Sequence, residues 1–259
     1  MKQKDPQAII QSKKLPNMQK SLTSKDSFKI NRPLLTIIMP VFNEAQTVEQ
    51  AIRRLSALPV SKELIVIDDY CTDGSRELLK KLYQEFKFKL ILHAQNMGKG
   101  YGVRQAAAYA KGKYMIVEDA DLELDIGVIA KMMEIIENEP SIDMVNGNRI
   151  LKKGGKSGIL QNLARVITSV LAKILYGKYL NDLLCSYKLC LVSKFKQLNL
   201  KSTRFGLETE WIIKAFKKGW KIVETDVLFM PRLHKQGKKI QFFDGFDIIW
   251  QLIKYRFTN

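Results

Sequence analysis

The pattern of apolar and polar positions predicts four successive strand–helix units. Four short runs of apolar, β-favouring residues are each followed by a stretch in which apolar residues recur every three or four positions, as in an amphipathic helix. After the first run, for example, Val48, Ile52 and Leu55 share this spacing. The four runs are 34–40, 63–69, 89–95 and 113–121. We therefore predict an α/β fold, with a mostly parallel central sheet and helices on both faces.

The two ends of the chain lack this alternation. Residues 1–32 are polar and lysine-rich, which predicts a disordered basic tail. The globular domain is then expected over 33–235. The remaining segment, 236–259, contains the aromatic stretch FFDGFDIIWQLIKYRF and has basic residues near its end. This composition favours an amphipathic segment that docks at a membrane interface, and an ordinary packing helix is the alternative.

The charge and the cysteine content of the chain limit the binding partners and the cellular compartment that we expect. The chain has 259 residues and a formal net charge of +17. That charge is compatible with solubility alone, with an anionic membrane or phosphorylated substrate, or with nucleic acid, but no nucleic-acid motif accompanies it and we expect no such partner. Three cysteines without C-x-x-C spacing favour neither a disulfide framework nor a zinc site. With no signal-peptide core and no apolar run of about 18 residues, we expect a cytoplasmic protein.

Polar residues follow each predicted strand. Ligands of open α/β sheets bind beyond the carboxyl ends of the strands, so these residues are expected to share one rim. They are residues 40–44, Asp68 with Asp69, residues 96–100 and residues 119–121.

The last of these groups belongs to the acidic stretch IVEDADLELD, residues 116–125. In an extended segment Asp119 and Asp121 project to the same side, and Glu123 joins them if the extension continues. Ala120 is small and permits a ligand to approach the backbone. Such carboxylates suit Mg²⁺ or Mn²⁺. The alternative is a solvated acidic loop in which Asp125 caps the next helix.

The other rim residues favour a nucleotide. Asp68 and Asp69 are placed to accept hydrogen bonds from the ring N–H of a base or from ribose hydroxyls. Asn43, Glu44, and Lys99 after Gly98 lie where helices are expected to begin, and helix N-termini and lysines attract phosphate. The phosphate loop G-x-x-x-x-G-K-[ST] and the dinucleotide fingerprint G-x-G-x-x-G are both missing from the sequence. A nucleotide held through a metal fits this rim best.

Several segments in order resemble the family 2 glycosyltransferases of the GT-A fold, over about residues 34–257. They are TIIMPVFNEAQTVEQAI, ELIVIDDYCTDGS, NMGKGYGVRQA, VEDADLELD, GNR at 147–149, DLLCSYKL, FGLETEWIIKAFKKGWKIVETDV and RLHKQGKKI. Their order and spacing are similar to the dolichyl- and polyprenyl-phosphate branch. The resemblance implies a nucleotide-diphosphate sugar donor, of the GDP-mannose or UDP-glucose type, and an inverting transfer.

The resemblance also implies roles for particular residues. Asp119 and Asp121 match the D-x-D metal pair of the family, with Glu123 as a further ligand, and Arg149 and Arg232 match basic positions that face the phosphates. The positions that match the nucleotide pocket are Pro40, Phe42, Glu44, Ile67 and Asp69. One departure stands out, because Tyr70 and Cys71 replace the glycine and serine of the common DDGSTDG.

Sugar transfer requires a stabilised leaving diphosphate and a nucleophile. Arg232, aided by Lys238 or Lys239, is expected to assist the metal in the first task. A sugar hydroxyl needs a general base, whereas a lipid phosphate is already anionic and needs only positioning. If a base exists, the candidates are Glu208, Glu210 and Asp182, each with a structural ion pair or helix cap as the alternative. We take Asp121, Arg232 and Glu210 as the candidate catalytic residues.

Three hypotheses remain from the sequence. The first is a metal-dependent transferase that loads a hexose onto a polyprenyl phosphate at the cytosolic face of a membrane, which it reaches peripherally or through a membrane-protein partner. A basic, glycine-containing loop at 148–158 would then close over the acceptor, unless it is only a solvated connector. The second is a transferase that acts on a glycan hydroxyl in surface polysaccharide synthesis. The third is a non-catalytic basic module that binds nucleic acid or lipid.

Overall fold

The computed structural model describes residues 9–11, 33–152, 159–204, 206–232 and 242–258. Within these ranges the strands are β1 (Ile9–Gln11), β2 (Leu35–Val41), β3 (Lys62–Asp68), β4 (Lys89–Leu92), β5 (Tyr114–Val117), β6 (Met144–Leu151), β7 (Lys188–Leu191) and β8 (Ile222–Phe229). The helices are α1 (Val48–Ala57), α2 (Ser75–Glu85), α3 (Lys99–Tyr109), α4 (Val128–Asn138), α5 (Ile159–Tyr176), α6 (Val192–Gln197), α7 (Leu207–Lys217) and α8 (Phe242–Phe257).

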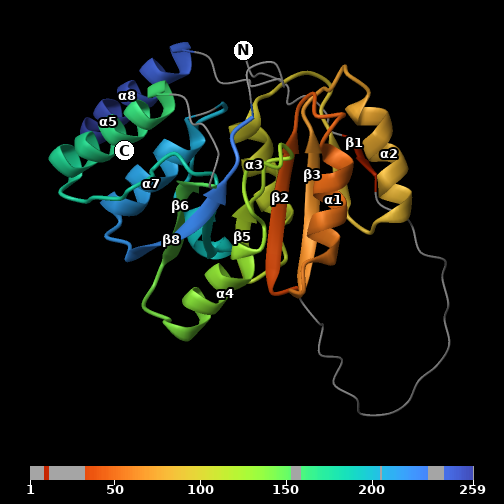
Figure 1. The fold of residues 1–259 in the computed structure, drawn as a ribbon, viewed down its shortest axis with the longest axis horizontal. Helices are drawn as coiled ribbons and strands as arrows, with labels where there is room; N and C mark the ends of the chain where they lie inside the picture. Colours follow the sequence, from red (N-terminus) through yellow and green to blue (C-terminus); the bar gives the residue numbers. More distant parts are fainter. Residues whose placement is uncertain (1–8, 12–32, 153–158, 205, 233–241, 259) are drawn as a thin grey trace, which may run out of the picture.

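The strands form a single sheet in the order β1-β4-β3-β2-β5-β7-β6-β8, with helices on both sides (Figure 1). Strands β4, β3, β2 and β5 run parallel, and so do β6 and β8. Strand β7 is antiparallel to both β5 and β6, and β1 is antiparallel to β4 at the edge. Because β2 to β5 are parallel, their carboxyl ends meet at one rim.

The core has two parts, one on each face of the sheet. Neighbouring residues of β2 serve both, since Ile37 and Met39 belong to the cluster beneath α1, α2 and α4, whereas Ile38 belongs to the cluster beneath α3, α6 and α7. This explains why the strands read as continuous apolar runs. Helices α5 and α8 pack on α7 and on each other (Figure 1). The Tyr176 hydroxyl of α5 donates to the Leu252 carbonyl of α8 at 2.7 Å.

The four predicted strand–helix units and the α/β fold class are confirmed. Two boundaries differ from the predictions. The tail expected to be disordered contains the short strand β1. The strand expected over 113–121 ends at Val117, because the register with β2 ends at Ile38 and the chain then turns, with Leu122 at φ 62°. In the segment predicted to be amphipathic, the described residues form α8, and no helix of the described residues is long and apolar enough to cross a membrane.

Candidate active site

The loops that follow β2 and β3 are joined by backbone-to-side-chain hydrogen bonds. The Asn43 amide donates to the Cys71 sulfur at 3.2 Å, and the Thr72 amide donates to Asn43 Oδ1 at 2.8 Å. The Glu44 amide donates to Ser75 Oγ at 2.8 Å in the same way. Burial raises the pKa of the Cys71 thiol, so this cysteine packs between the loops rather than reacting.

Asp69 lies at the carboxyl end of β3 and is nearly buried. Its Oδ1 contacts His93 Nδ1 and the Met97 amide, both at 2.7 Å, and its Oδ2 accepts from the Gly98 amide at 2.8 Å. A carboxylate has about four acceptor positions, and these contacts use three of them. Asp69 therefore fixes the loop that leads into α3. His93 is the residue at this point whose role the sequence analysis missed, since an isolated histidine after a strand carries no signal of its partner.

Lys99, the first residue of α3, joins two acidic segments. Its Nζ lies 2.8 Å from Asp119 Oδ1 and 2.6 Å from Glu208 Oε1, at the start of α7. Burial alone would lower the pKa of Lys99, but the two carboxylates raise it, so the lysine stays charged. Glu208 therefore belongs to the rim. Nothing in the sequence signals this contact, because Glu208 and Lys99 are 109 positions apart.

Arg232, just after β8, contacts the remaining rim carboxylates. Its guanidinium forms two hydrogen bonds to Glu44, at 2.7 and 2.9 Å, and its Nη2 lies 3.6 Å from Asp121 Oδ2. Glu123 accepts from the Arg232 amide at 2.9 Å. The Thr47 hydroxyl lies 3.0 Å from Glu44 Oε2 and orients that carboxylate further. Residues separated by almost two hundred positions therefore meet at the rim.

After β5, Asp119 pairs with Lys99 and Asp121 lies beside Arg232, so both aspartates face the rim although the segment turns and is not extended as predicted. Burial raises the pKa of Asp121 to about 7, and the charges of Asp119 and Glu123 raise it too, against the opposing effect of Arg232. Ala120, between the two aspartates, is buried. Glu118 does not belong to the site, because it is buried on the other side and its pKa lies well above the usual range, chiefly owing to burial.

These residues fit a divalent metal by their chemistry. A bound hard cation would relieve the charge repulsion that Asp119 and Glu123 exert on Asp121. Within the described parts of the chain, however, no group of three His, Cys, Asp or Glu side chains is arranged to hold a metal ion as it stands. Lys99 and Arg232 balance the carboxylates instead. A metal would be held by Asp119 and Asp121, with Glu123 nearby.

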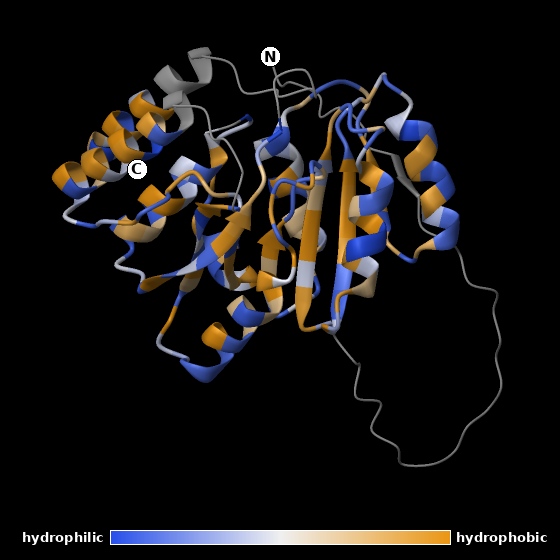
Figure 2. Ribbon diagram, viewed as in Figure 1, coloured by the Kyte–Doolittle hydropathy of each residue, from blue (hydrophilic) through white to orange (hydrophobic). Residues whose placement is uncertain are grey.

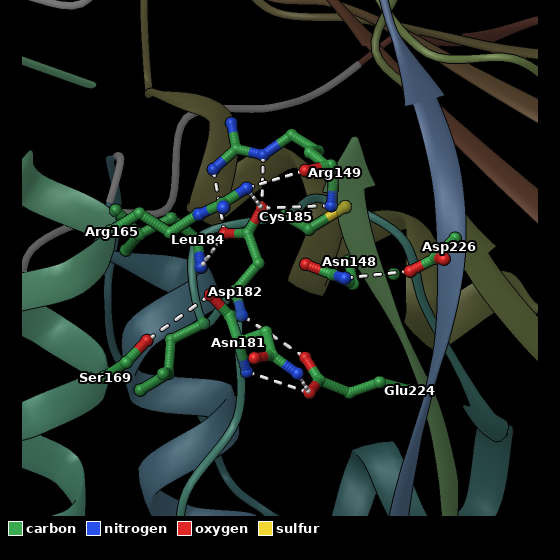
Figure 3. Close-up of polar contacts among 12 residues, drawn as sticks. Asn148, Arg149, Arg165, Ser169, Asn181, Asp182, Leu184, Cys185, Glu224 and Asp226 are labelled. Atoms are coloured by element: carbon green, nitrogen blue, oxygen red, sulfur yellow. Dashed lines mark hydrogen bonds and ion pairs between the residues drawn. The ribbon is translucent and has the colours of Figure 1, made fainter. Parts of the chain in front are cut away.

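Arg149, at the end of β6, is engaged by a buried carboxylate (Figure 3). Asp182 is 0% exposed and accepts from Arg149 Nε at 2.6 Å and Nη2 at 2.8 Å. Burial would lower the pKa of Arg149, and Asp182 raises it. Arg165 of α5 donates to the Arg149 carbonyl at 2.6 Å and lies 4.0 Å from Asp182, so two guanidinium groups share one carboxylate. Asp182 therefore forms the structural ion pair that was the alternative to its role as a general base.

Glu210 was predicted as a catalytic residue, and its surroundings argue against that role. It is fully buried in α7 and accepts from the Lys201 and Ser202 amides at 2.8 and 2.7 Å, while Lys214 Nζ lies 2.8 Å away. Burial would raise the pKa of Glu210, but these donors lower it. The carboxylate holds the 201–203 loop, which lies against the start of α3. A Cβ atom added at Gly98 would be 2.3 Å from the carbonyl oxygen of Thr203.

The structure places the remaining predicted nucleotide-binding residues in different surroundings. Pro40 and Phe42 lie at the carboxyl end of β2, and Phe42 is exposed. Ile67 is an exception, because its side chain is fully buried beneath α3 and packs near Gly102. Lys238 and Lys239 lie outside the described residues, as does the 153–158 part of the basic loop. Residues 148–151, which were predicted to belong to that loop, form the end of strand β6 instead.

The sequence matches a known family over most of this structure. Residues 36–197, more than half of the chain, match the family model described as Glycosyl transferase family 2. The chain belongs to glycosyl transferase family 2. This confirms the resemblance inferred from the motifs and places this family 2 chain among enzymes, which argues against a non-catalytic binding module.

The individual proteins to which the chain is similar share less than a third of their aligned residues with it. "Glycosyltransferase AglJ" of Haloferax volcanii is 27% identical over 199 residues, which are 76% of this chain and 63% of that protein. "Poly-beta-1,6-N-acetyl-D-glucosamine synthase" of Staphylococcus aureus is 29% identical over 131 residues, 50% of this chain and 32% of that protein. The chain thus spans less than two thirds of the length of these curated relatives.

Solved structures share the fold. One is glucosyl-3-phosphoglycerate synthase from Mycobacterium tuberculosis, crystallised with Mn²⁺, UDP and phosphoglyceric acid. It is 17% identical to this chain and superposes with a TM-score of 0.65, and the match covers 88% of this chain and 80% of that one. The same protein has been crystallised with Mg²⁺ and UDP. At this identity the likeness establishes the fold of this family 2 chain, in agreement with the predicted GT-A architecture.

Proposed function

We propose that this chain is a metal-dependent, inverting glycosyltransferase that moves a hexose from a nucleotide-diphosphate sugar to a polyprenyl phosphate at the cytosolic face of a membrane. The choice of acceptor rests on one observation, which is that each of the three candidate bases is paired with a cationic side chain. Asp182 is held by Arg149, Glu210 by Lys214 and two backbone amides, and Glu208 by Lys99. An anionic phosphate nucleophile needs no base, so this arrangement suits it better than a hydroxyl.

The donor is proposed to bind at the rim. Mg²⁺ or Mn²⁺, when bound at Asp119 and Asp121, would neutralise charge on the leaving diphosphate. Arg232 and Lys99 lie beside the same carboxylates and are positioned to turn to the diphosphate oxygens. Asp69 keeps one acceptor position for the base or ribose. Divalent metals and UDP in crystals of the structural relative support this donor class.

The acceptor is proposed to approach over α5 and α8. These helices expose apolar side chains at helical spacing. Figure 2 colours much of the ribbon of both helices orange, for hydrophobic residues. They are Leu163, Val166, Ile167, Val170 and Ile174 on α5, and Trp250, Ile253 and Phe257 on α8. Lys173, Lys254 and Arg256 lie on the same helices, and apolar faces bordered by basic residues suit an anionic membrane surface. Arg165 of α5, which donates to the Arg149 carbonyl, would attract the lipid phosphate.

The decisive experiment is a transfer assay with a panel of acceptors. The protein is incubated with MnCl₂, labelled GDP-mannose or UDP-glucose, and polyprenyl phosphate in detergent, 3-phosphoglycerate, or a glycan. Label on the lipid alone is the expected result. Label only on phosphoglycerate, the ligand of the structural relative, or only on the glycan would overturn the lipid acceptor, and label on none would overturn the proposed function.

Membrane docking has its own test. Ile174→Asn should reduce co-sedimentation with phosphatidylserine vesicles, because it places an amide in the exposed apolar face of α5. Leu228→Asn makes the same change from an aliphatic side chain to an amide at an exposed residue of β8. It is the control and should not alter sedimentation. Equal binding by both variants would contradict docking through α5.

A hydroxyl acceptor is the second candidate, and Glu208 is the observation that favours it. Of the three candidate bases it alone shares a partner, Lys99, with the D-x-D pair. If Glu208 takes a proton from a hydroxyl, Glu208→Gln should abolish transfer while the affinity for UDP is kept. Transfer by Glu208→Gln at the wild-type rate would exclude this mechanism.

A further inference from the structure

Tyr70 combines an exposed aromatic ring with a costly backbone conformation. It lies directly after β3 and Asp69, its φ angle is 66°, and its side chain is 45% exposed. Non-glycine residues seldom adopt positive φ, and residues that do so without local need tend to mark functional sites. An exposed ring gains little free energy from burial. The fold therefore maintains a tyrosine where glycine would be less strained.

The backbone on both sides of Tyr70 is fixed by its neighbours. The Asp69 amide donates to the Val41 carbonyl at 2.9 Å, and the Cys71 amide donates to Asp68 Oδ1 at the same distance. The His93 amide donates to the Asp68 carbonyl, also at 2.9 Å. These bonds dictate the turn, but they involve only backbone atoms and the buried Asp68. They leave the choice of side chain at position 70 unexplained.

The ring of Tyr70 contacts the guanidinium group of Arg76, which is itself fixed by other residues. The guanidinium carbon of Arg76 lies 5.5 Å from the ring centroid, within cation–π range. Arg76 is itself fixed, since it pairs with the buried Asp68 and donates from Nη2 to the His93 carbonyl at 2.7 Å. A ring held in this way loses little conformational freedom when a second flat group stacks on it.

Tyr70 also has the right neighbours for a base. Asp69, with its remaining acceptor position, precedes it, and Phe42 is exposed at the end of the adjacent strand β2. The hydrogen bonds between the two loops, such as Thr72 to Asn43, hold these segments side by side. An aromatic platform beside a carboxylate acceptor suits a nucleobase, which offers a flat face and ring N–H donors.

We propose that Tyr70 stacks on the nucleobase of the donor and is a determinant of nucleotide affinity. This inference rests on the proposed nucleotide-sugar donor. It gives a chemical role to the residue that most clearly separates this chain from the DDGSTDG pattern, in which glycine stands at this position and offers no ring.

The test compares three variants by isothermal titration calorimetry with UDP and with GDP in MnCl₂. Tyr70→Gly removes the ring and the backbone strain together, Tyr70→Phe keeps the ring, and Tyr179→Gly removes another exposed loop tyrosine as a matched control. Stacking predicts a Kd roughly tenfold higher for Tyr70→Gly with at least one nucleotide. Tyr70→Phe and Tyr179→Gly should bind like the wild type, and Tyr70→Gly should keep an unchanged or higher Tm.

The outcomes separate this inference from the function on which it rests. If the wild type binds nucleotide and Tyr70→Gly binds equally well, the stacking role is overturned while the donor class stands. If Tyr70→Phe binds as poorly as Tyr70→Gly, the hydroxyl matters and stacking is again overturned. If the wild type binds neither UDP nor GDP, the nucleotide-sugar donor and the stacking role both fail.

Discussion

Replacing Asp182 by asparagine should destabilise the fold strongly, because it removes the charge that compensates a largely buried arginine. The carboxylate is fully buried and accepts two hydrogen bonds from the Arg149 guanidinium, one from the Arg149 amide and one from the Leu184 amide (Figure 3). The Arg165 guanidinium lies 4.0 Å from it. Asparagine has nearly the same shape, so packing is kept and the electrostatic contribution is isolated.

The magnitude follows from this burial. Removing one partner of a buried ion pair costs about 3–5 kcal/mol, because the other charge is left without compensation. The Arg149 side chain keeps 20% exposure, so water relieves part of that cost. We therefore expect the lower end, about 3 kcal/mol. For a chain of this size each kcal/mol lowers Tm by about 2–4 °C, which gives a decrease of roughly 6–12 °C.

Urea unfolding followed by circular dichroism measures the change in the free energy of unfolding. The matched control is Asp226→Asn, the same chemical change on β8, where the exposed carboxylate accepts a hydrogen bond from Asn148. That variant should stay within about 0.5 kcal/mol of the wild type. If Asp182→Asn is also within about 1 kcal/mol of the wild type, the reasoning on buried charge at this site is wrong.

Two further predictions concern pH and the role of Glu210. Asp69 raises the pKa of His93 against the effect of burial, so the stabilisation that His93 provides is complete below its unfolded value of about 6.5 and is lost as the pH rises through the folded value. The Tm advantage of the wild type over His93→Gln should therefore shrink as the pH rises above about 6.5, and a difference that stays constant with pH would refute this. Glu210→Gln should lose about 3 kcal/mol of stability at pH 7, since the Lys201 and Ser202 amides lose a charged acceptor. Because the pKa of Glu210 is lowered, this loss should vanish in acid as the pH falls through the folded value, and an unchanged urea midpoint at pH 7 would contradict the structural role.

The sequence predicted those features that depend on local pattern. The apolar runs that became β2 to β5 are continuous because both faces of the sheet are covered, and the acidic ends of parallel strands had to meet at one rim. Asp119 and Asp121 both lie at that rim, where they contact Lys99 and Arg232. The positive φ angle of Leu122, directly after them, was not signalled by any propensity.

What the sequence did not predict depends on contacts between distant residues. Glu208, Glu210 and Asp182 were equal candidates for a base, since a carboxylate gives no local sign of its partner. Only the fold assigns Lys99, Lys214 and Arg149 to them, and thereby distinguishes a rim residue from two structural ones. The burial of Ile67 under α3 was hidden for the same reason, because it depends on the close approach of Gly102.

The central claim is that Asp119 and Asp121 bind a divalent ion together with a nucleotide diphosphate. Electron paramagnetic resonance of Mn²⁺ tests it directly, because bound ions lose the sharp signal of the free ion. With UDP present, the wild type and Asp226→Asn are expected to remove the free Mn²⁺ signal beyond what UDP alone removes, and Asp121→Asn is expected not to. Equal Mn²⁺ binding by Asp121→Asn and the wild type would contradict the account.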